Sequence, residues 1–219
     1  MAHAFQVRLC ARTLESPPEV SAARGISGII LAAGASRRMG TPKALLDYRG
    51  ETFLNRLIRI VGQVSDPVIV VLGYHAEEIQ EKTKPGARFV INPDPERGQL
   101  SSLQTALQEL PPDFPGFLFI PVDCPAVAAI TVQRLAEAFA RRAPDTLFVI
   151  PRYGGKRGHP VFAAPEIARE LLQLPPAGQA REVVHRHVGR TVYVDAGDPG
   201  VLSDVDDLAA YRQLMESLL

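Results

Sequence analysis

The sequence predicts a single α/β domain with a mostly parallel central sheet and helices on both faces. Three observations indicate this fold class. Short apolar, β-branched segments alternate along the chain with segments of helical periodicity. The strand candidates are apolar along nearly their whole length, as strands buried on both faces are. The 219 residues are enough for one sizeable α/β domain.

The individual elements follow from these patterns in chain order. Apolar runs predict strands at residues 26–33, 68–72, 87–91, 117–121, 146–150 and 191–194. Helical spacing predicts helices at residues 52–63, 75–83, 101–110, 131–141, 165–172, 180–188 and 206–218. A parallel sheet of this kind binds ligands outside the carboxyl ends of its strands. Functional residues are therefore expected in the loops that follow strands.

The domain is expected to cover residues 25–219, preceded by a flexible extension at residues 1–24. That extension lacks the continuous apolar core of a secretory signal. No apolar run approaches the roughly 18 residues that cross a bilayer, and we expect a cytoplasmic protein without a membrane partner. Lys plus Arg equals Asp plus Glu, at 24 each, which gives no reason to expect nucleic acid as a partner. The two cysteines, Cys10 and Cys124, do not make a disulfide framework or a zinc site.

The segment from Ile26 to Lys43 is the strongest chemical signal. An apolar strand is followed by a loop of small residues and three cations, ISGIILAAGASRRMGTPK. Backbone N–H groups in such a loop can face an anion, and the cations add charge, which suits a polyphosphate. The loop has no dinucleotide-binding GxGxxG, and the spacing of Gly34 and Gly40 does not match a Walker loop.

The second signal is FLFIPVDCP, where a buried strand runs directly into Asp123 between Pro121 and Pro125. The prolines stiffen the backbone and prevent a helix from starting there. A carboxylate held at the end of a central strand can bind a divalent cation, because Mg²⁺ needs only one or two carboxylates beside substrate phosphates. The alternative is a turn or helix-capping aspartate.

The third signal, LSDVDDLAAY, precedes the last predicted helix. Asp206 is a candidate second metal ligand, with Asp204 as the alternative. Asp206 or Asp207 could instead cap the helix, since a carboxylate at a helix N-terminus also suits its dipole.

Two further loops carry polar residues. In INPDPERGQLSSL, Asn92 ends a strand, Gly98 gives flexibility, and Ser101 could cap the following helix. In GGKRGHPVF, Lys156, Arg157 and His159 lie within four residues of one another beside glycines. A histidine in a turn is often structural, but this cluster favours contact with an anion.

These motifs together resemble the MobA-like nucleotidyltransferases. The opening segment matches the signature LAAGxSxRMGxxK at every fixed position, and PVDCP and the C-terminal acidic stretch follow in the expected order. Asp207 to Ala210 depart from the TPED portion of that family's DIDTPEDY stretch. The resemblance covers nearly all of residues 25–211. It implies a Rossmann-like sheet of the nucleotide-diphospho-sugar transferase type.

The resemblance also implies roles for individual residues. Arg38, Lys43 and Asp123 are expected to be catalytic, Asp123 and Asp206 to bind Mg²⁺ or Mn²⁺, and Arg157 and His159 to contact the acceptor. The nucleotide is expected to contact Leu31, Ala32, Ala33, Gly34, Ser36, Arg38, Lys43, Asn92, Gly98 and Ser102.

The implied reaction transfers a nucleoside monophosphate from a nucleoside triphosphate (NTP) to a phosphate oxygen and releases pyrophosphate. The spelling LAAG, together with PVDCP and GHPVF, looks closer to the branch that transfers CMP from CTP to molybdopterin. A molybdoenzyme or its maturation factor is then a further expected partner. The alternatives are a guanylyltransferase, or a transferase acting on a sugar phosphate, a polyol phosphate or phosphocholine. From another class, the alternative is a non-catalytic nucleotide-binding maturation chaperone, against which intact Arg38, Lys43 and Asp123 argue.

Overall fold

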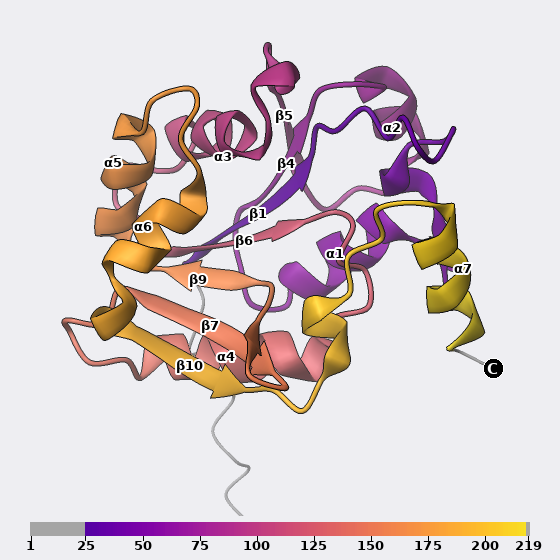
Figure 1. Ribbon diagram of the computed structural model, residues 1–219. Coiled ribbons are helices and arrows are strands. Elements are labelled where there is room, and N and C mark those ends of the chain that lie inside the picture. Colours follow the sequence, from indigo (N-terminus) through magenta and orange to yellow (C-terminus); the bar gives the residue numbers. More distant parts are fainter. Residues whose placement is uncertain (1–24, 218–219) are drawn as a thin grey trace, which may run out of the picture.

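The computed structural model describes residues 25–217, and a twisted central sheet organises them (Figure 1). Its strands follow the order β10-β7-β9-β6-β1-β4-β5, and β8 pairs with β7 outside this path. The strands are β1 (Ser27–Ala32), β4 (Val68–Leu72), β5 (Arg88–Ile91), β6 (Phe117–Pro121), β7 (Phe148–Tyr153), β8 (Lys156–Arg157), β9 (Val161–Ala163) and β10 (Thr191–Asp195). A separate small sheet joins β2 (Asp47–Tyr48) to β3 (Glu51–Thr52).

Helices cover both faces of the sheet, which confirms the predicted fold class. One face is covered by α1 (Phe53–Val61), α2 (Ala76–Lys82), α4 (Ala129–Ala140) and α7 (Leu208–Glu216). The other is covered by α3 (Gln99–Gln108), α5 (Pro165–Gln173) and α6 (Ala180–Arg186). Within residues 25–217, no helix is long and apolar enough to cross a bilayer.

The strands divide their side chains between two apolar cores. In β1, Ile30 and Ala32 pack on the α1 side, whereas Ile29 and Leu31 pack on the α3 side. Strands β4 and β6 alternate in the same way, because successive side chains in a strand point to opposite faces. Burial on both faces explains why these strands read as continuous apolar runs.

The sheet contains two short antiparallel strands that the sequence did not predict, β8, which pairs with β7, and β9. Strand β9 lies between β6 and β7 and runs antiparallel to both, while the other neighbouring pairs along the sheet order are parallel. It has only three residues and follows the short β7–β8 hairpin, so its apolar run was read as part of a loop. Because β9 is reversed, its first residue, Val161, pairs with Phe119 in the middle of β6, and the residues before Val161 lie toward the carboxyl end of β6. The segment preceding β9 therefore emerges next to Asp123.

Several predicted boundaries were wrong for identifiable reasons. Strand β7 runs past residue 150 because Pro151 needs no N–H bond there and pairs in register with Val194 of β10. Helix α3 begins at Gln99, and the Ser101 hydroxyl donates to the Asp94 and Gly98 carbonyls, so Ser101 is not the N-cap. Asp206 lies before α7, whose cap is Asp207. The predicted extension at residues 1–24 and the end of the last predicted helix, at residue 218, lie outside the described residues.

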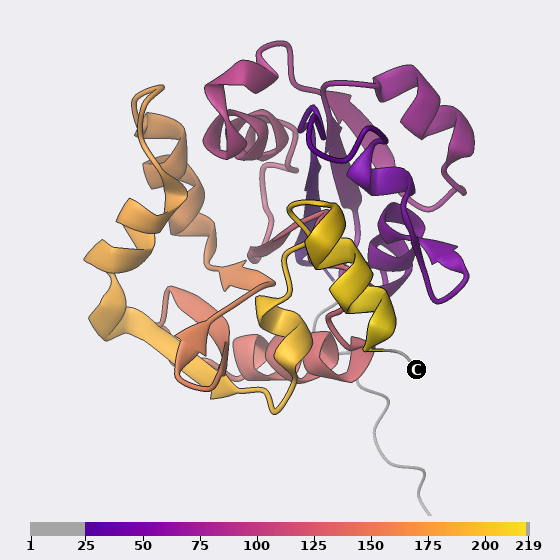
Figure 2. The same cartoon turned by 45° about the vertical axis from the view of Figure 1, so that its right-hand side comes forward.

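The C-terminal segment crosses the carboxyl edge of the sheet (Figure 2). After β10 the chain forms the 3₁₀ turn Pro199–Leu202 and then reaches α7, which packs beside α1. Tyr211 of α7 lies edge-on to Phe53, with ring centroids 6.0 Å apart, and its hydroxyl donates to the Asp47 carbonyl at 2.9 Å. This crossing brings the acidic residues 204–206 over the ends of β1 and β6.

Candidate active site

A cavity of about 280 Å³ lies at the carboxyl ends of β1 and β6. It contains most of the predicted nucleotide and metal residues: Leu31, Ala32, Ala33, Gly34, Ser36, Arg38, Lys43, Gly98, Ser102, Asp123 and Asp206. They come from four separate stretches of the chain, which the parallel sheet gathers at one edge. The predicted clustering of these residues is therefore observed, although clustering alone does not establish what each one binds.

The loop after β1 is held by contacts within itself. Ser36 adopts a left-handed conformation, with φ of 50°, and its hydroxyl accepts the Lys43 backbone N–H at 2.9 Å. The Ser36 carbonyl accepts the N–H of Met39, whose side chain is buried. Within residues 25–217, no hydrogen bond engages the N–H groups of Gly34 or Ala35. These two donors remain available to an anion. Ser36 closes the loop and fixes the position of the Lys43 backbone.

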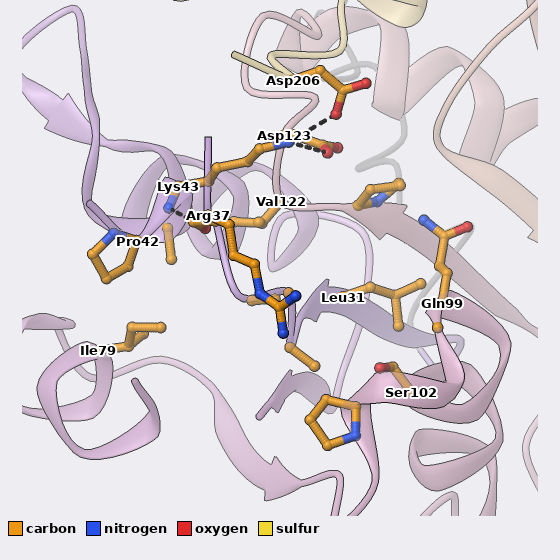
Figure 3. A pocket seen from close by; sticks show the side chains of 18 of the residues that line it. Leu31, Arg37, Pro42, Lys43, Ile79, Gln99, Ser102, Val122, Asp123 and Asp206 are labelled. Carbon is orange, nitrogen blue, oxygen red and sulfur yellow. Dashed lines mark hydrogen bonds and ion pairs between the residues drawn. The ribbon is translucent and has the colours of Figure 1, made fainter. Parts of the chain in front are cut away.

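Lys43 lies at the centre of a charge cluster (Figure 3). Its ammonium donates to Asp123 Oδ2 at 3.1 Å and to Asp206 Oδ1 at 2.9 Å. Only 14% of the Lys43 side chain is exposed, compared with 23% for Asp123 and 52% for Asp206. Arg38 approaches Asp206 at 3.4 Å from the solvent side. The Lys43 hydrogen bond and charge lower the pKa of Asp206, so this carboxylate stays ionised in neutral solution.

A backbone contact fixes the position of the C-terminal acids relative to Asp123. The Val205 N–H donates to the Asp123 carbonyl at 2.8 Å. The Asp123 turn is in turn closed by the Cys124 N–H, which donates to the Pro121 carbonyl. As a result, Asp204 and Asp206 flank the Asp123 turn from a segment more than 80 positions away in sequence.

The donor set suits a divalent cation that is shared with a substrate. Within the described residues, no three His, Cys, Asp or Glu side chains form a group able to hold a metal by themselves. Asp123 and Asp206 nevertheless converge on the same cation, the Lys43 ammonium. Two hard carboxylates beside an open cavity match a Mg²⁺ or Mn²⁺ site completed by phosphate oxygens and water. They do not match a closed structural site.

Asn92 is buried and is not among the residues that line the cavity, so its expected contact with the nucleotide stays a prediction. Its side chain is buried, and its amide donates to the hydroxyls of Ser101 at 2.8 Å and Ser102 at 3.0 Å. The side-chain amide oxygen of Asn92, Oδ1, accepts the Asp94 N–H at 2.9 Å. Ser102 lines the cavity, and accepting from Asn92 leaves its own proton free to be donated. Asn92 thus orients Ser102.

Arg157 and His159 line a second cavity of about 270 Å³, together with Cys124 and Asp204. This cavity shares Gln99, Pro121 and Asp123 with the first, so the two meet at Asp123. Burial lowers the pKa of His159, against the opposing charges of Asp123 and Asp204. Burial also raises the pKa of the Cys124 thiol, with the Asp123 charge acting in the same direction. Both groups are therefore neutral near pH 7.

The wall of the second cavity is built by close backbone contact. The His159 N–H donates to the Val201 carbonyl at 2.9 Å. A Cβ added to Gly158 would lie 2.1 Å from the same carbonyl oxygen, so only glycine permits this approach. The segment before β9 is thus fastened to the 3₁₀ turn that precedes Asp204.

The sequence analysis missed several cavity residues. Gln99 borders both cavities and projects from the start of α3 (Figure 3). Ile79 of α2 and Pro95 of the 3₁₀ turn Pro95–Arg97 also line the first cavity. The only clue to Gln99 was its place directly after Gly98. Arg37, which lines the cavity, pairs with Glu96 at 3.0 Å and is 75% exposed.

Comparison with known proteins identifies the family. The profile of the MobA-like NTP transferase domain matches residues 28–191. A probable molybdenum cofactor guanylyltransferase of Rhodopirellula baltica is 31% identical over 64% of this chain and 68% of its own. The molybdenum cofactor cytidylyltransferase of Escherichia coli is 25% identical over 83% of this chain and 91% of its own. The crystal structure of Rv0371C from Mycobacterium tuberculosis, a manganese complex, superposes with a TM-score of 0.70 at 29% identity, covering 88% of this chain and 99% of that one. The chain belongs to the MobA-like family and is a nucleotidyltransferase.

Proposed function

We propose that the protein transfers CMP from CTP to the phosphate of molybdopterin and releases pyrophosphate. The observation that carries this proposal is the meeting of two cavities at Asp123, one lined by the cationic loop after β1 and one by Arg157 and His159. Such an arrangement would hold a triphosphate and an acceptor phosphate on either side of one carboxylate. Relatives bear both cytidylyl- and guanylyltransferase names, so GTP is the alternative nucleotide.

In this mechanism the first cavity binds the triphosphate. The free N–H groups of Gly34 and Ala35, together with Arg38 and Lys43, would neutralise the phosphates. The proton of Ser102 would be donated to an acceptor atom on the base, in an orientation set by Asn92. The spelling LAAG, with Ala33 where the guanylyl branch usually carries glycine, supports CTP as the nucleotide.

The second cavity would hold the acceptor phosphate through Arg157, with His159 as a neutral hydrogen-bonding partner. An oxygen of that phosphate forms a bond to the α-phosphorus, and the bond from the α-phosphorus to the bridging oxygen breaks. Pyrophosphate leaves with the electron pair. An ionised phosphate needs no general base, so alignment of the two groups and neutralisation of charge supply the catalysis.

Asp123 and Asp206 would hold the divalent cation, with Asp204 as the alternative second ligand. When bound, Mg²⁺ or Mn²⁺ would neutralise charge on the phosphates of both substrates. Lys43 is the cation between the two carboxylates in this structure, and its long side chain can turn toward the triphosphate. The carboxylates would then be released to the metal.

The proposal is tested by binding and by product release. CTP, GTP, UTP and ATP are compared in a thermal-shift panel with Mg²⁺, where a ligand at 100 times its dissociation constant stabilises the fold by about 2.7 kcal/mol. We expect CTP to give the largest shift. Pyrophosphate release from CTP in the presence of molybdopterin then tests the reaction. A clear preference for GTP would overturn the cytidylyl assignment, and nucleotide binding without pyrophosphate release would favour the non-catalytic chaperone.

A further inference from the structure

The loop that carries Asp123 is held in place by contacts with other parts of the chain. Residues 123–128 form neither a helix nor a strand. The Val205 N–H donates to the Asp123 carbonyl at 2.8 Å, and the Ala128 N–H donates to the Asp198 carboxylate at 2.9 Å. These two contacts fix the ends of the loop, so the position of Asp123 also depends on what holds the residues between them.

Arg56 of α1 holds the middle of this loop. Its Nε donates to the Pro125 carbonyl at 2.7 Å, and its Nη2 donates to the Val127 carbonyl at 3.2 Å. A planar guanidinium presents its donors in a fixed geometry, so one side chain can bridge two carbonyls of the same loop. Arg56 lines neither of the two cavities that meet at Asp123. Any effect of Arg56 on the chemistry must therefore pass through the loop.

The guanidinium of Arg56 has no carboxylate partner. Among residues 25–217, the only arginine of α1 in an ion pair is Arg59, which reaches Glu51 at 2.7 Å. Arg56 is partly buried, and this burial lowers its pKa. Its guanidinium carbon lies 5.1 Å from the centroid of the buried Tyr48 ring. The ring and the two carbonyls offset the cost of removing an unpaired cation from water.

Tyr48 connects this arrangement to the segment that carries Lys43. It follows Lys43 closely in the chain and lies in β2, and its ring is edge-on to Phe53 of α1 with centroids 6.5 Å apart. In the active site, the Lys43 ammonium and the Asp123 carboxylate meet at 3.1 Å. Arg56 and Tyr48 therefore form a second contact between the same two segments.

A third cavity, of about 680 Å³, is lined in part by Arg56, Tyr48 and Ala126. Its other walls are α7 and the 3₁₀ turn Pro199–Leu202. A small cation in this cavity can reach the position of the Arg56 guanidinium when the side chain is shortened.

We propose that Arg56 is a positioning residue for the metal site, which holds Asp123 where the divalent cation binds by bridging the Pro125 and Val127 carbonyls. The inference rests on the proposed function, because it takes Asp123 as the ligand of that cation. Arg56 contacts neither substrate nor cation and acts through the loop alone. Loss of a group that orients a metal ligand typically weakens metal binding by roughly 10–100-fold.

The first test measures the loop itself and needs neither metal nor nucleotide. Arg56→Met keeps the length of the side chain and removes its donors. We expect faster hydrogen exchange in peptides that cover residues 122–132, with the exchange of β1 and β4 unchanged. Arg59→Met is the matched control, because it removes an arginine from the same helix that pairs with Glu51 and does not contact the loop.

The second test measures metal binding, with Mn²⁺ alone as the probe. The free Mn²⁺ signal in electron paramagnetic resonance is followed during titration of the full chain. We expect the Mn²⁺ dissociation constant to rise by roughly tenfold or more in Arg56→Met and to stay unchanged in Arg59→Met. Asp123→Asn serves as the reference for loss of the ligand itself.

The third test is chemical rescue, which also serves if Arg56→Met proves too unstable to purify. Arg56→Ala should bind Mn²⁺ weakly, and added methylguanidinium should restore part of the affinity by entering through the third cavity. The same additive should restore nothing in Asp123→Asn. A role in general stability would not give this pattern, because methylguanidinium does not stabilise folded proteins in general.

The inference is overturned if folded Arg56→Met exchanges residues 122–132 at the normal rate, if it binds Mn²⁺ with normal affinity, or if methylguanidinium rescues nothing in Arg56→Ala. Failure of the proposed function looks different. If the unaltered protein and Asp123→Asn bind Mn²⁺ equally, Asp123 is not the metal ligand, and both proposals fall. If the unaltered protein binds Mn²⁺ through Asp123 but releases no pyrophosphate from CTP, the proposed function alone is contradicted.

Discussion

The two halves of the active site are built in different ways. The nucleotide half is local: one strand, β1, leads into one loop whose residues from Leu31 to Lys43 hold each other in place. The proposed acceptor half is assembled from distant segments: the His159 N–H, before β9, donates to Val201 of the 3₁₀ turn, and the Val205 N–H, after that turn, donates to the Asp123 carbonyl. A site built from one continuous segment can be recognised in the sequence as a motif. A site built from distant segments shows only separate glycines and acidic residues.

This difference makes the halves separable by mutation. Changes in the loop after β1 should affect the triphosphate, changes around Gly158 should affect the acceptor, and Asp123 should affect both because both cavities include it. The following expectations test that separation in order of decreasing effect.

Asp123→Asn should lower turnover by roughly three orders of magnitude or more, since it removes charge from the point where both substrates meet. The shape of the side chain is preserved, and we expect normal folding by circular dichroism and thermal melting. Added Mg²⁺ should recover only part of the rate, measured as pyrophosphate release. Asp206→Asn should lower turnover less than Asp123→Asn does, because the Asp206 carboxylate is more exposed than that of Asp123.

The control for these variants is Asp145→Asn, at an exposed aspartate that lines neither cavity. It should retain full turnover. Near-normal turnover in correctly folded Asp123→Asn would remove the shared carboxylate from the mechanism and with it the reason for placing both substrates around it.

Lys43→Ala should reduce the use of the triphosphate by roughly 10²–10³-fold, about 3–4 kcal/mol of lost transition-state stabilisation. Arg38→Ala should be similar. Arg37→Ala should be milder, because the family signature leaves that position free and Arg37 is paired with Glu96. The measurement is kcat/KM for CTP in the three variants. Equal losses at Arg37 and Arg38 would contradict the assignment of these side chains.

Gly158→Ala should damage the acceptor half alone. The new methyl group would collide with the Val201 carbonyl, and overpacking of this kind costs about 1–3 kcal/mol. Chemical denaturation should show the loss of stability, and the KM for the acceptor should rise while nucleotide-dependent thermal shifts persist. Gly189→Ala is the matched control, because a Cβ there meets no atom within 4 Å. Loss of nucleotide binding in Gly158→Ala would show that the halves are not separable.

The smallest expected effect is a dependence of stability on pH through His159. Burial lowers its pKa below the ordinary 6.5, so the unfolded chain binds this proton more readily than the folded protein. The contribution of His159 to the free energy of unfolding should therefore be at its maximum above pH 6.5. It should fall as the pH drops from 6.5 toward the lower pKa of His159 in the folded protein. One group contributes at most about 1.4 kcal/mol per pH unit. Denaturation of His159→Asn, compared with the unaltered protein at pH 7 and 5.5, should show a weaker decline.

The same contrast explains what could be predicted from the sequence. The parallel strands and the cationic loop were predictable because burial on both faces and a continuous motif are local properties. Strand β9 and the contact between Val205 and Asp123 were not, since a three-residue strand has no periodicity and a backbone hydrogen bond has no sequence signature. The place of Gln99 in both cavities appears only once α3 is packed against the sheet.

The long sequence separation between Lys43 and the C-terminal segment also bears on when, during folding, the proposed active site is complete. Lys43 and Asp206 are separated by 163 positions, yet they form one ion pair at the catalytic edge. Closing so long a loop costs entropy that is recovered only after α7 has packed against α1. A growing chain that has completed the loop after β1 and the Asp123 turn would still lack one of its two acids. If Asp206 holds the metal as proposed, the ability to use a nucleotide is a late event in the maturation of this protein, reached only when α7 docks.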